Sequence, residues 1–314
     1  MQKPRGLISV VVPLYYEQEV LKTSFEAMDK VMKNSLYDYE LIYVDDGSQD
    51  RTWEILQRIA KDNPQVKGFK LSRNFGHQLA VSAGMKQAKG DAIIIIDADL
   101  QDPPEVMLEM IKKWEEGYEV VYGKRLKRKG ENFLKKFTAF LYYRLLKALS
   151  AYDIPLDTGD FRLIDSRVCD TLTEMKEHNR FLRGMGAWTG FNQCAVEYVR
   201  NERYAGQTKY TFKKMINLAL SGILGFSYKP LLLPFNFGIF LMIASFISII
   251  VSLITGFASA VGFGFWAFEI ILFLMGIVFI TFGIFGAYLS RIMEEALDRP
   301  LYIISKAVNA KIEK

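Results

Sequence analysis

Apolar runs alternate with amphipathic segments through roughly the first 120 residues. Four runs are short, rich in Val, Ile and Tyr, and bounded by turn residues, which is typical of β-strands. They cover residues 7–16, 39–46, 66–74 and 90–99. Apolar residues recur at helical spacing over residues 19–34, 51–62 and 77–89. The alternation predicts an α/β domain in which helices cover both faces of a mainly parallel sheet.

Acidic side chains follow two of these predicted strands. DDGS begins at Asp45, and DADLQD begins at Asp97 directly after four isoleucines. Carboxylates are costly beside an apolar interior unless a positive group meets them. Ligands of such sheets bind beyond the carboxyl ends of the strands. The sequence therefore predicts a ligand site at this edge of the sheet.

The DADLQD segment has the composition of a cation site. Asp97, Asp99 and Gln101 occupy alternate positions, so an extended backbone would point their side chains the same way. Two converging carboxylates repel each other unless a cation neutralises them. A few hard oxygen ligands suit Mg²⁺ or Mn²⁺, and magnesium usually completes its shell with water and substrate phosphates. We expect a site for a metal-bound diphosphate.

Two long stretches of the second half carry no charged residue. They cover residues 230–268 and 270–290. Because about 20 apolar residues cross a bilayer, they predict a transmembrane hairpin with spans at about 231–255 and 266–290. Buried helices of a soluble domain are the alternative, but such helices seldom lack charge on every face. The hairpin would occupy residues 229–290, between an α/β domain over residues 1–228 and a tail over 291–314.

The charges that flank the hairpin predict its orientation. They are Lys209, Lys213, Lys214, Lys229, Arg291 and Arg299. By the positive-inside rule, we expect the α/β domain and both termini in the cytoplasm, and a multi-pass protein of the cell (inner, plasma) membrane. The apolar run near the N-terminus stops at Glu17 without a cleavage site, so it is interpreted as a strand. The two cysteines, Cys169 and Cys194, suit a reducing compartment.

Two basic segments contain many aromatic and aliphatic residues. They cover about residues 131–150 and 207–227. Such helices can lie in the membrane interface with their cations toward anionic headgroups. Ordinary helices packed on the sheet are the alternative. No recognisable nucleic-acid module accompanies the basic residues, so we expect no nucleic-acid partner.

Seven stretches, taken in order, carry a resemblance to a known family. They are SVVVPLYYEQE, YVDDGSQDRT, LSRNFGHQLAVSAG, IDADLQDPPE, VVYGKR, DTGDFRLID and RYAGQTKY. The sequence resembles family 2 glycosyltransferases of the GT-A fold, specifically those that use polyprenyl phosphates, such as dolichyl-phosphate mannosyl synthases and bactoprenol glucosyltransferases. The resemblance implies inverting transfer of a hexose or N-acetylhexosamine, from UDP-glucose or UDP-N-acetylglucosamine in preference, to undecaprenyl or another polyprenyl phosphate. It further implies a role in cell-envelope glycan modification, with a flippase, a downstream membrane glycosyltransferase and a second copy of the chain as possible partners.

The resemblance also assigns site residues. The nucleotide sugar would contact Pro13, Tyr15, Glu17, Asp45, Asp46, Asp97, Ala98 and Gln101. The metal would be bound by Asp97, Asp99 and Gln101, and the catalytic residues would be Asp99, Asp160 and Arg203. The acceptor or diphosphate would contact Arg125, Arg162, Thr208 and Lys209. Asp45 and Asp46 have an alternative interpretation as a turn and helix cap.

Asp160 occupies the position of the catalytic carboxylate in inverting enzymes of this fold. A sugar hydroxyl would need it as a general base, whereas a phosphate monoester, with a second pKa of about 6, is already largely ionised. With a lipid phosphate acceptor, Asp160 would orient a substrate or stabilise positive charge at the anomeric carbon. His77 is interpreted as a loop residue rather than a base, since no nucleophile motif accompanies it.

Other functions fit the sequence less well. A processive polysaccharide synthase would carry a QxxRW motif and more spans, and a dehydrogenase would carry GxGxxG after the first strand. Neither motif is present. A catalytically silent, membrane-anchored module that binds lipid or nucleotide on the same fold stays as the alternative.

Overall fold

The computed structural model describes residues 6–126, 158–178, 180–200 and 263–311 of the chain. Its centre is an eight-stranded sheet with the order β7-β5-β6-β4-β1-β2-β3-β8. The strands are β1 Leu7–Leu14, β2 Asp38–Asp45, β3 Val66–Leu71, β4 Ala92–Ile95, β5 Val120–Arg125, β6 Thr158–Asp165, β7 Gln193–Tyr198 and β8 Ile304–Val308. All four strands predicted from the apolar runs are confirmed as β1 to β4.

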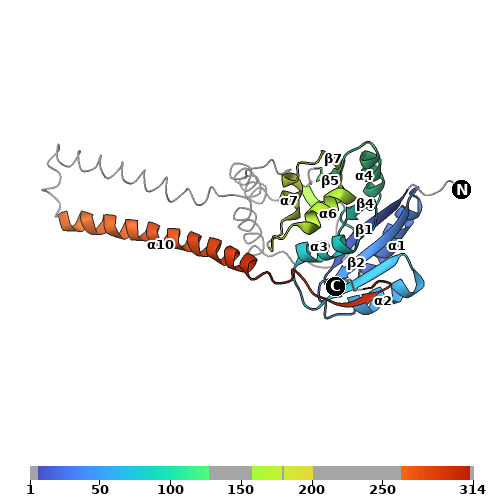
Figure 1. Cartoon of the computed structure of the whole chain (residues 1–314), viewed down its shortest axis with the longest axis horizontal. Coiled ribbons are helices and arrows are strands. Elements are labelled where there is room, and N and C mark those ends of the chain that lie inside the picture. The colour runs from blue at the N-terminus through green and yellow to red at the C-terminus, as the bar shows by residue number, and fades with distance from the viewer. Residues whose placement is uncertain (1–5, 127–157, 179, 201–262, 312–314) are drawn as a thin grey trace.

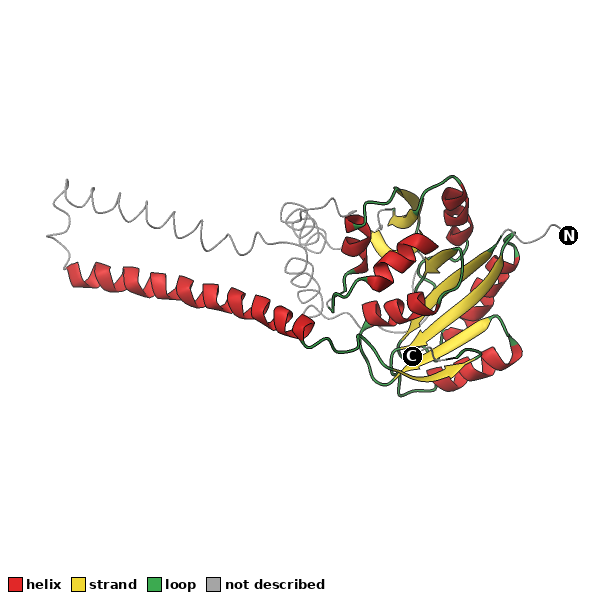
Figure 2. Ribbon diagram, in the orientation of Figure 1, coloured by secondary structure: helices red, strands yellow, loops and turns green. Residues whose placement is uncertain are grey.

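The sheet is mixed and mainly parallel. β1 pairs in parallel with β2 and β4, and β2 pairs in parallel with β3. β6 runs antiparallel to both β4 and β5, β7 is parallel to β5, and β8 is antiparallel to β3. The strands at the centre are apolar on both faces because helices cover both, as Figure 2 shows.

Two apolar layers hold the helices on the sheet. These helices are α1 Leu21–Lys33, α2 Thr52–Asp62, α3 His77–Gln87, α4 Val106–Glu115, α6 Ser166–Glu174 and α7 Leu182–Trp188; the described residues also form α10 Phe263–Ala296. One layer joins α1, α2 and α4 to one face, and the other joins α3, α6 and α7 to the opposite face. The three predicted helices are confirmed as α1 to α3, with ends shifted by no more than two residues.

Strand direction decides which residues meet at the edge of the sheet. The carboxyl ends of β1, β2, β4, β5 and β7 lie along one edge. Because β6 is antiparallel, its first residues reach this same edge, and Thr158 pairs with Lys124 near the end of β5. Asp160 therefore lies at the same end of the sheet as the segments that follow β1, β2 and β4.

Helix α10 extends away from the α/β domain (Figure 1). It contains the predicted second span, while the predicted first span and both predicted interfacial segments lie outside the described residues. Within the described part of the chain, no helix has the length and apolar character that a membrane span requires. The hairpin stays a prediction.

The end of α10 is attached to the α/β domain. His178 donates its backbone N–H to Glu295 at 2.8 Å, and the Nδ1 atom of its ring lies 3.0 Å from the same carboxylate. The chain then returns to the sheet as β8, where Ser72 donates to the carbonyl of Ile303 at 2.9 Å. The residues predicted to form a C-terminal tail therefore include an edge strand of the central sheet.

Candidate active site

Asp160 lies at the centre of a network of polar contacts near the start of β6. Its Oδ1 accepts from Arg183 Nε at 2.9 Å, and its Oδ2 accepts from Gln78 Nε2 at 3.1 Å. His77 Nε2 lies 3.3 Å from Oδ2. The partners come from the first turns of α3 and α7, which Gln78 joins by accepting from the backbone N–H of Leu182 at 3.1 Å. Both oxygens of the carboxylate have partners.

His77 joins this network to the DADLQD segment. Its Nε2 is 3.7 Å from Asp97 Oδ1 as well as 3.3 Å from Asp160. Burial lowers the pKa of His77, but Asp97 and Asp160 outweigh burial and raise it to about 9. The interpretation of His77 as a loop residue was wrong, because it opens α3 and lies between two carboxylates of the site.

The two carboxylates that flank His77 have opposite environments. Burial would raise the pKa of Asp160, but Arg183 and His77 hold it well below its usual range. Burial raises the pKa of Asp97, and the nearby carboxylates of Asp160 and Asp99 raise it further, against the effect of His77. Asp160 is thus a stable anion, whereas the charge on Asp97 lacks full compensation within the protein.

The backbone of DADLQD turns rather than staying extended. β4 ends at Ile95, Leu100 has a left-handed φ of 57°, and Asp99 Oδ1 accepts from the backbone N–H of Gln101 at 3.1 Å. The premise of alternating side chains on an extended strand was therefore wrong. A non-glycine residue in this conformation is strained, and such strain concentrates at functional sites.

The acidic groups of this segment fit a divalent cation that arrives with a substrate. No cluster of three or more His, Cys, Asp or Glu side chains suited to a metal occurs within the described ranges. Magnesium, however, is commonly bound by one or two carboxylates plus substrate phosphates. Asp97 and Asp99 could supply those carboxylates and Gln101 an amide oxygen, and the uncompensated charge at Asp97 favours a cation there. The bound ion would neutralise diphosphate charge.

Asp45 and Asp46 organise the loops beside this site. Asp45 is fully buried and accepts from the backbone N–H of Ser48 at 2.9 Å. Asp46 accepts from the backbone N–H groups of Phe75 at 2.7 Å and Gly76 at 2.9 Å. The side chains of both residues therefore hold turns and loops, as the alternative interpretation predicts. Asp46 fixes the loop that leads into His77. Their contact with a nucleotide stays a prediction.

The remaining residues predicted to hold the nucleotide follow β1 or lie beside Asp97. Pro13 and Ala98 are buried. Tyr15 is 36 % exposed and packs edge-on against Tyr16, whose φ of 56° is left-handed. Glu17 donates its backbone N–H to Thr52 at 3.0 Å. An exposed aromatic pair at the end of a central strand is a suitable surface for a base or ribose.

The predicted phosphate-binding cations have different surroundings. Arg125 ends β5 and remains partly exposed. Arg162 is 5 % exposed, and its guanidinium points to the backbone carbonyls of Gly159, Asp160 and Leu182, each at 3.4 Å. Burial lowers the pKa of Arg162 to about 10. Arg162 thus holds the backbone of the segment that carries Asp160. Arg203, Thr208 and Lys209 lie outside the described residues.

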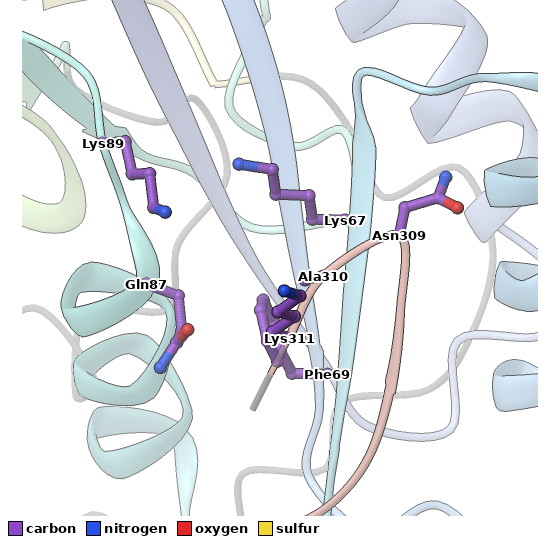
Figure 3. Close-up of a pocket in the computed structure, with 7 residues that line it drawn as sticks. All are labelled: Lys67, Phe69, Gln87, Lys89, Asn309, Ala310 and Lys311. Atoms are coloured by element: carbon purple, nitrogen blue, oxygen red, sulfur yellow. The ribbon is translucent and has the colours of Figure 1, made fainter. Parts of the chain in front are cut away.

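A pocket elsewhere on the domain is distinct from this site. It has a volume of about 610 Å³ and lies near the start of β3 and the end of β8, at the opposite edge of the sheet (Figure 3). Its lining consists of Lys67, Phe69, Gln87, Lys89, Asn309, Ala310 and Lys311. Lys67 is ion-paired there with Glu40, a carboxylate that Ser9 and the backbone of Lys89 also contact.

Sequence reasoning missed Gln78 and Arg183 as partners of Asp160. Arg183 is 23 residues from Asp160 and Gln78 is 82 residues away. The only local signal was the polar pair His77 and Gln78 at the start of a predicted helix, on the edge where ligands bind.

Comparison with known proteins places the chain in a family. Residues 9–173 match the model of glycosyl transferase family 2. The chain is 50 % identical to the uncharacterized glycosyltransferase YkcC of Bacillus subtilis, over 95 % of this chain and 93 % of YkcC. It is 38 % identical to the SfII prophage-derived bactoprenol glucosyl transferase of Shigella flexneri, over 96 % of this chain and 98 % of that protein. Among solved structures, glucosyl-3-phosphoglycerate synthase from Mycobacterium tuberculosis aligns with a TM-score of 0.47 and 19 % identity, covering 71 % of this chain and 79 % of that one.

The mixed sheet with its acidic carboxyl-end edge is that of a GT-A α/β glycosyltransferase domain. The chain belongs to glycosyltransferase family 2.

Proposed function

We propose that the protein transfers a hexose or N-acetylhexosamine from a UDP-sugar, UDP-glucose or UDP-N-acetylglucosamine in preference, to undecaprenyl or another polyprenyl phosphate. The observation that carries the proposal is the environment of Asp160. Both of its oxygens are engaged, by Arg183 at 2.9 Å and by Gln78 and His77 at 3.1 and 3.3 Å. A carboxylate held in this way is a poor proton acceptor.

An acceptor that needs no general base resolves this difficulty. A phosphate monoester is largely ionised at neutral pH, so its oxygen can attack the anomeric carbon directly. The bond from that carbon to the diphosphate oxygen breaks, and its electron pair leaves with UDP. In-line attack inverts the anomeric centre, so an α-linked donor yields a β-linked product. Asp160 would stabilise the positive charge that develops on the sugar.

The donor end would use the acidic segment after β4. Asp97, Asp99 and Gln101 would hold a divalent cation on the diphosphate, and Tyr15 with Tyr16 offers an aromatic surface near the end of β1. The relatives support the lipid acceptor, since several named bactoprenol glucosyl transferases are about 38 % identical over nearly the whole chain.

The membrane architecture belongs to the same proposal. Basic interfacial segments and a hairpin at residues 229–290, with the catalytic domain in the cytoplasm, would hold the active site beside the lipid acceptor. A flippase and a downstream membrane glycosyltransferase would then use the product for cell-envelope glycan modification. The uncharged stretches and their basic flanks support this arrangement.

The decisive experiment measures lipid glycosylation. Purified full-length protein in detergent is incubated with radiolabelled UDP-sugars, polyprenyl phosphate and Mg²⁺ or Mn²⁺, and labelled lipid is extracted into organic solvent. We expect label from one sugar, lost on chelation and in Asp99→Ala, and greatly reduced in Asp160→Asn, which should retain UDP binding. Nucleotide binding without turnover on any donor would favour the catalytically silent module instead.

A further inference from the structure

The pocket of Figure 3 is lined by an excess of positive charge. It lies where α3 ends at Gln87 and where the end of β8 pairs with the start of β3. Of the described residues that line it, three are lysines, Lys67, Lys89 and Lys311, and none is acidic. Its volume of about 610 Å³ falls within the range of small-molecule sites. The pocket therefore has the size of a ligand site and a cationic lining.

A buried carboxylate next to the pocket balances one of the three lysines. Glu40 is 4 % exposed. Its Oε1 accepts from the hydroxyl of Ser9 at 2.6 Å and from the backbone N–H of Lys89 at 2.8 Å, and its Oε2 pairs with the ammonium group of Lys67. Three ammonium groups and one carboxylate leave an excess of two positive charges. Like charges gathered around one cavity repel each other, so an anion that enters it is stabilised.

Two of the lysines approach the cavity from opposite sides. Figure 3 shows the side chains of Lys67 and Lys89 extending toward each other. Lys67 lies two residues before Phe69 on β3, so both side chains point to the face of the sheet that α3 covers. Phe69 also lines the pocket and is 1 % exposed, which makes it part of the packed wall. The two ammonium groups therefore face a shared volume with a fixed wall.

The third lysine belongs to an anchored segment. Asn309, directly after β8, has a left-handed φ of 55°, and its side-chain amide donates to three backbone carbonyls. These carbonyls belong to Ala60, Asn63 and Val66, which are 243 to 249 positions away in the chain. Lys311 follows two residues after Asn309 and lines the pocket. The segment that carries Lys311 is thus attached to the residues that precede β3.

The pocket is separate from the candidate active site. Helix α3 begins with His77, which contacts Asp160, and ends with Gln87, which lines the pocket. At a rise of about 1.5 Å per residue, the two ends of this helix are about 15 Å apart. A ligand in the pocket therefore does not occupy the region of Asp160.

We propose that this pocket binds a small, soluble, polar phosphate monoester, separately from the donor and acceptor of the proposed reaction. Such a monoester carries about 1.5 to 2 negative charges at neutral pH, which matches the excess of two positive charges, whereas a phosphodiester carries a single charge. Lysine ammonium groups bind phosphate oxygens as point charges. The amide of Gln87 offers hydrogen bonds to a polar group attached to the phosphate. The site uses none of the groups near Asp160, so its test does not depend on the proposed function.

The test measures the binding of glycerol phosphate, a small polar monoester, by phosphorus NMR of the ligand. The full-length protein is kept in a maltoside detergent, which contains no phosphorus, and EDTA removes the divalent cations that would recruit phosphate to the candidate active site. We expect saturable binding that Lys89→Gln and Lys311→Gln each weaken about fivefold, the upper end for an exposed ion pair. Lys311→Arg keeps the positive charge and should stay within about twofold of the wild type.

Lys306→Gln is the matched control. Lys306 is an exposed lysine on β8, five residues before Lys311, and is not among the residues that line the pocket. Its replacement should leave the affinity unchanged. Lys67 is not replaced, because loss of its ammonium group would leave the buried Glu40 without its counter-ion and destabilise the fold. Tm is measured for every variant, and weaker binding at an unchanged Tm assigns the loss to the pocket.

Several results would overturn the proposal. One is the absence of saturable binding to the wild type, and another is equal weakening in Lys306→Gln, which would indicate a general effect of surface charge. Binding that persists in Lys89→Gln and Lys311→Gln but is lost in Arg183→Met would place the ligand near Asp160 instead. Weaker binding that occurs only together with a lower Tm would assign the effect to folding. Equal affinity for glycerophosphoglycerol, the phosphodiester headgroup of an anionic lipid, would assign the pocket to a lipid surface.

Discussion

Replacing Arg183 tests whether the carboxylate of Asp160 must be held in place. Arg183→Met keeps much of the aliphatic volume and removes the guanidinium. Both partners are largely buried, with 21 % of the Arg183 side chain and 15 % of the Asp160 side chain exposed. Removing one member of a buried ion pair generally costs about 3–5 kcal/mol, but Gln78 and His77 still contact Asp160.

The remaining contacts favour a lower value, that of a single hydrogen bond to a charged group. Such a bond contributes about 1.5–3 kcal/mol. Since each 1.36 kcal/mol changes a rate about tenfold, we expect kcat/KM to fall roughly 10- to 150-fold if the contact is needed in the transition state. Arg183→Lys keeps the charge without the planar group and should fall between the variant and the wild type.

Arg167 provides a matched control on the same part of the chain. Its Nε lies 3.0 Å from Asp165 Oδ1, almost the same geometry as the 2.9 Å contact of Arg183, but its side chain is 68 % exposed. An exposed pair contributes about 0–1 kcal/mol, so Arg167→Met should keep full activity. The assay is the release of UDP with polyprenyl phosphate, and Tm is measured in parallel. Equal activity and equal Tm for the two methionine variants would refute the reasoning.

Three other predictions concern stability. Gly84→Ala places a methyl group 2.4 Å from Val11 Cγ1 and should cost about 1–3 kcal/mol, seen as a lower Tm. Glu295 and a backbone carbonyl raise the pKa of His178; the stability this gives is fully present below the unfolded pKa of about 6.5 and is lost as pH rises through the folded pKa. His178→Gln should therefore be less stable than wild type at pH 6, and the difference should shrink at alkaline pH. Asn309 donates to three backbone carbonyls at a φ of 55°; Asn309→Ala should speed amide exchange in β8 more than Asn309→Gly, which tolerates that φ.

The sequence was sufficient for the strands and helices whose signals are local. The Ile93 to Ile96 run predicted a strand buried on both faces, and β4 is such a strand. The edge strand β8 was missed because its five residues are half exposed and pair with β3, more than 230 residues earlier in the chain. A half-exposed strand of five residues gives only a weak local pattern.

The candidate site was predicted only in part for the same physical reason. Asp160 and the DADLQD segment could be predicted because each belongs to a short motif of neighbouring residues. The structure brings both to the carboxyl end of the sheet. The role of His77 depends on its 3.3 Å approach to Asp160, from the start of α3 to the start of β6, which sequence spacing does not encode. The extended backbone expected after β4 was replaced by a turn, since Asp99 accepts from the N–H of Gln101 and Leu100 takes a left-handed conformation.

The opposite environments of Asp97 and Asp160 explain how neighbouring carboxylates can serve different purposes. His77 contacts both, but Asp160 also has Arg183, and its pKa is held low, whereas burial and neighbouring carboxylates raise the pKa of Asp97. Pairs of groups whose pKa values are moved apart mark a division of roles. In the proposed reaction, an anion that the protein compensates by itself would be available in every state to stabilise positive charge on a sugar. One that the protein leaves partly uncompensated would gain most from a cation that enters with the diphosphate, so the proposed reaction would join donor binding to completion of the charge balance.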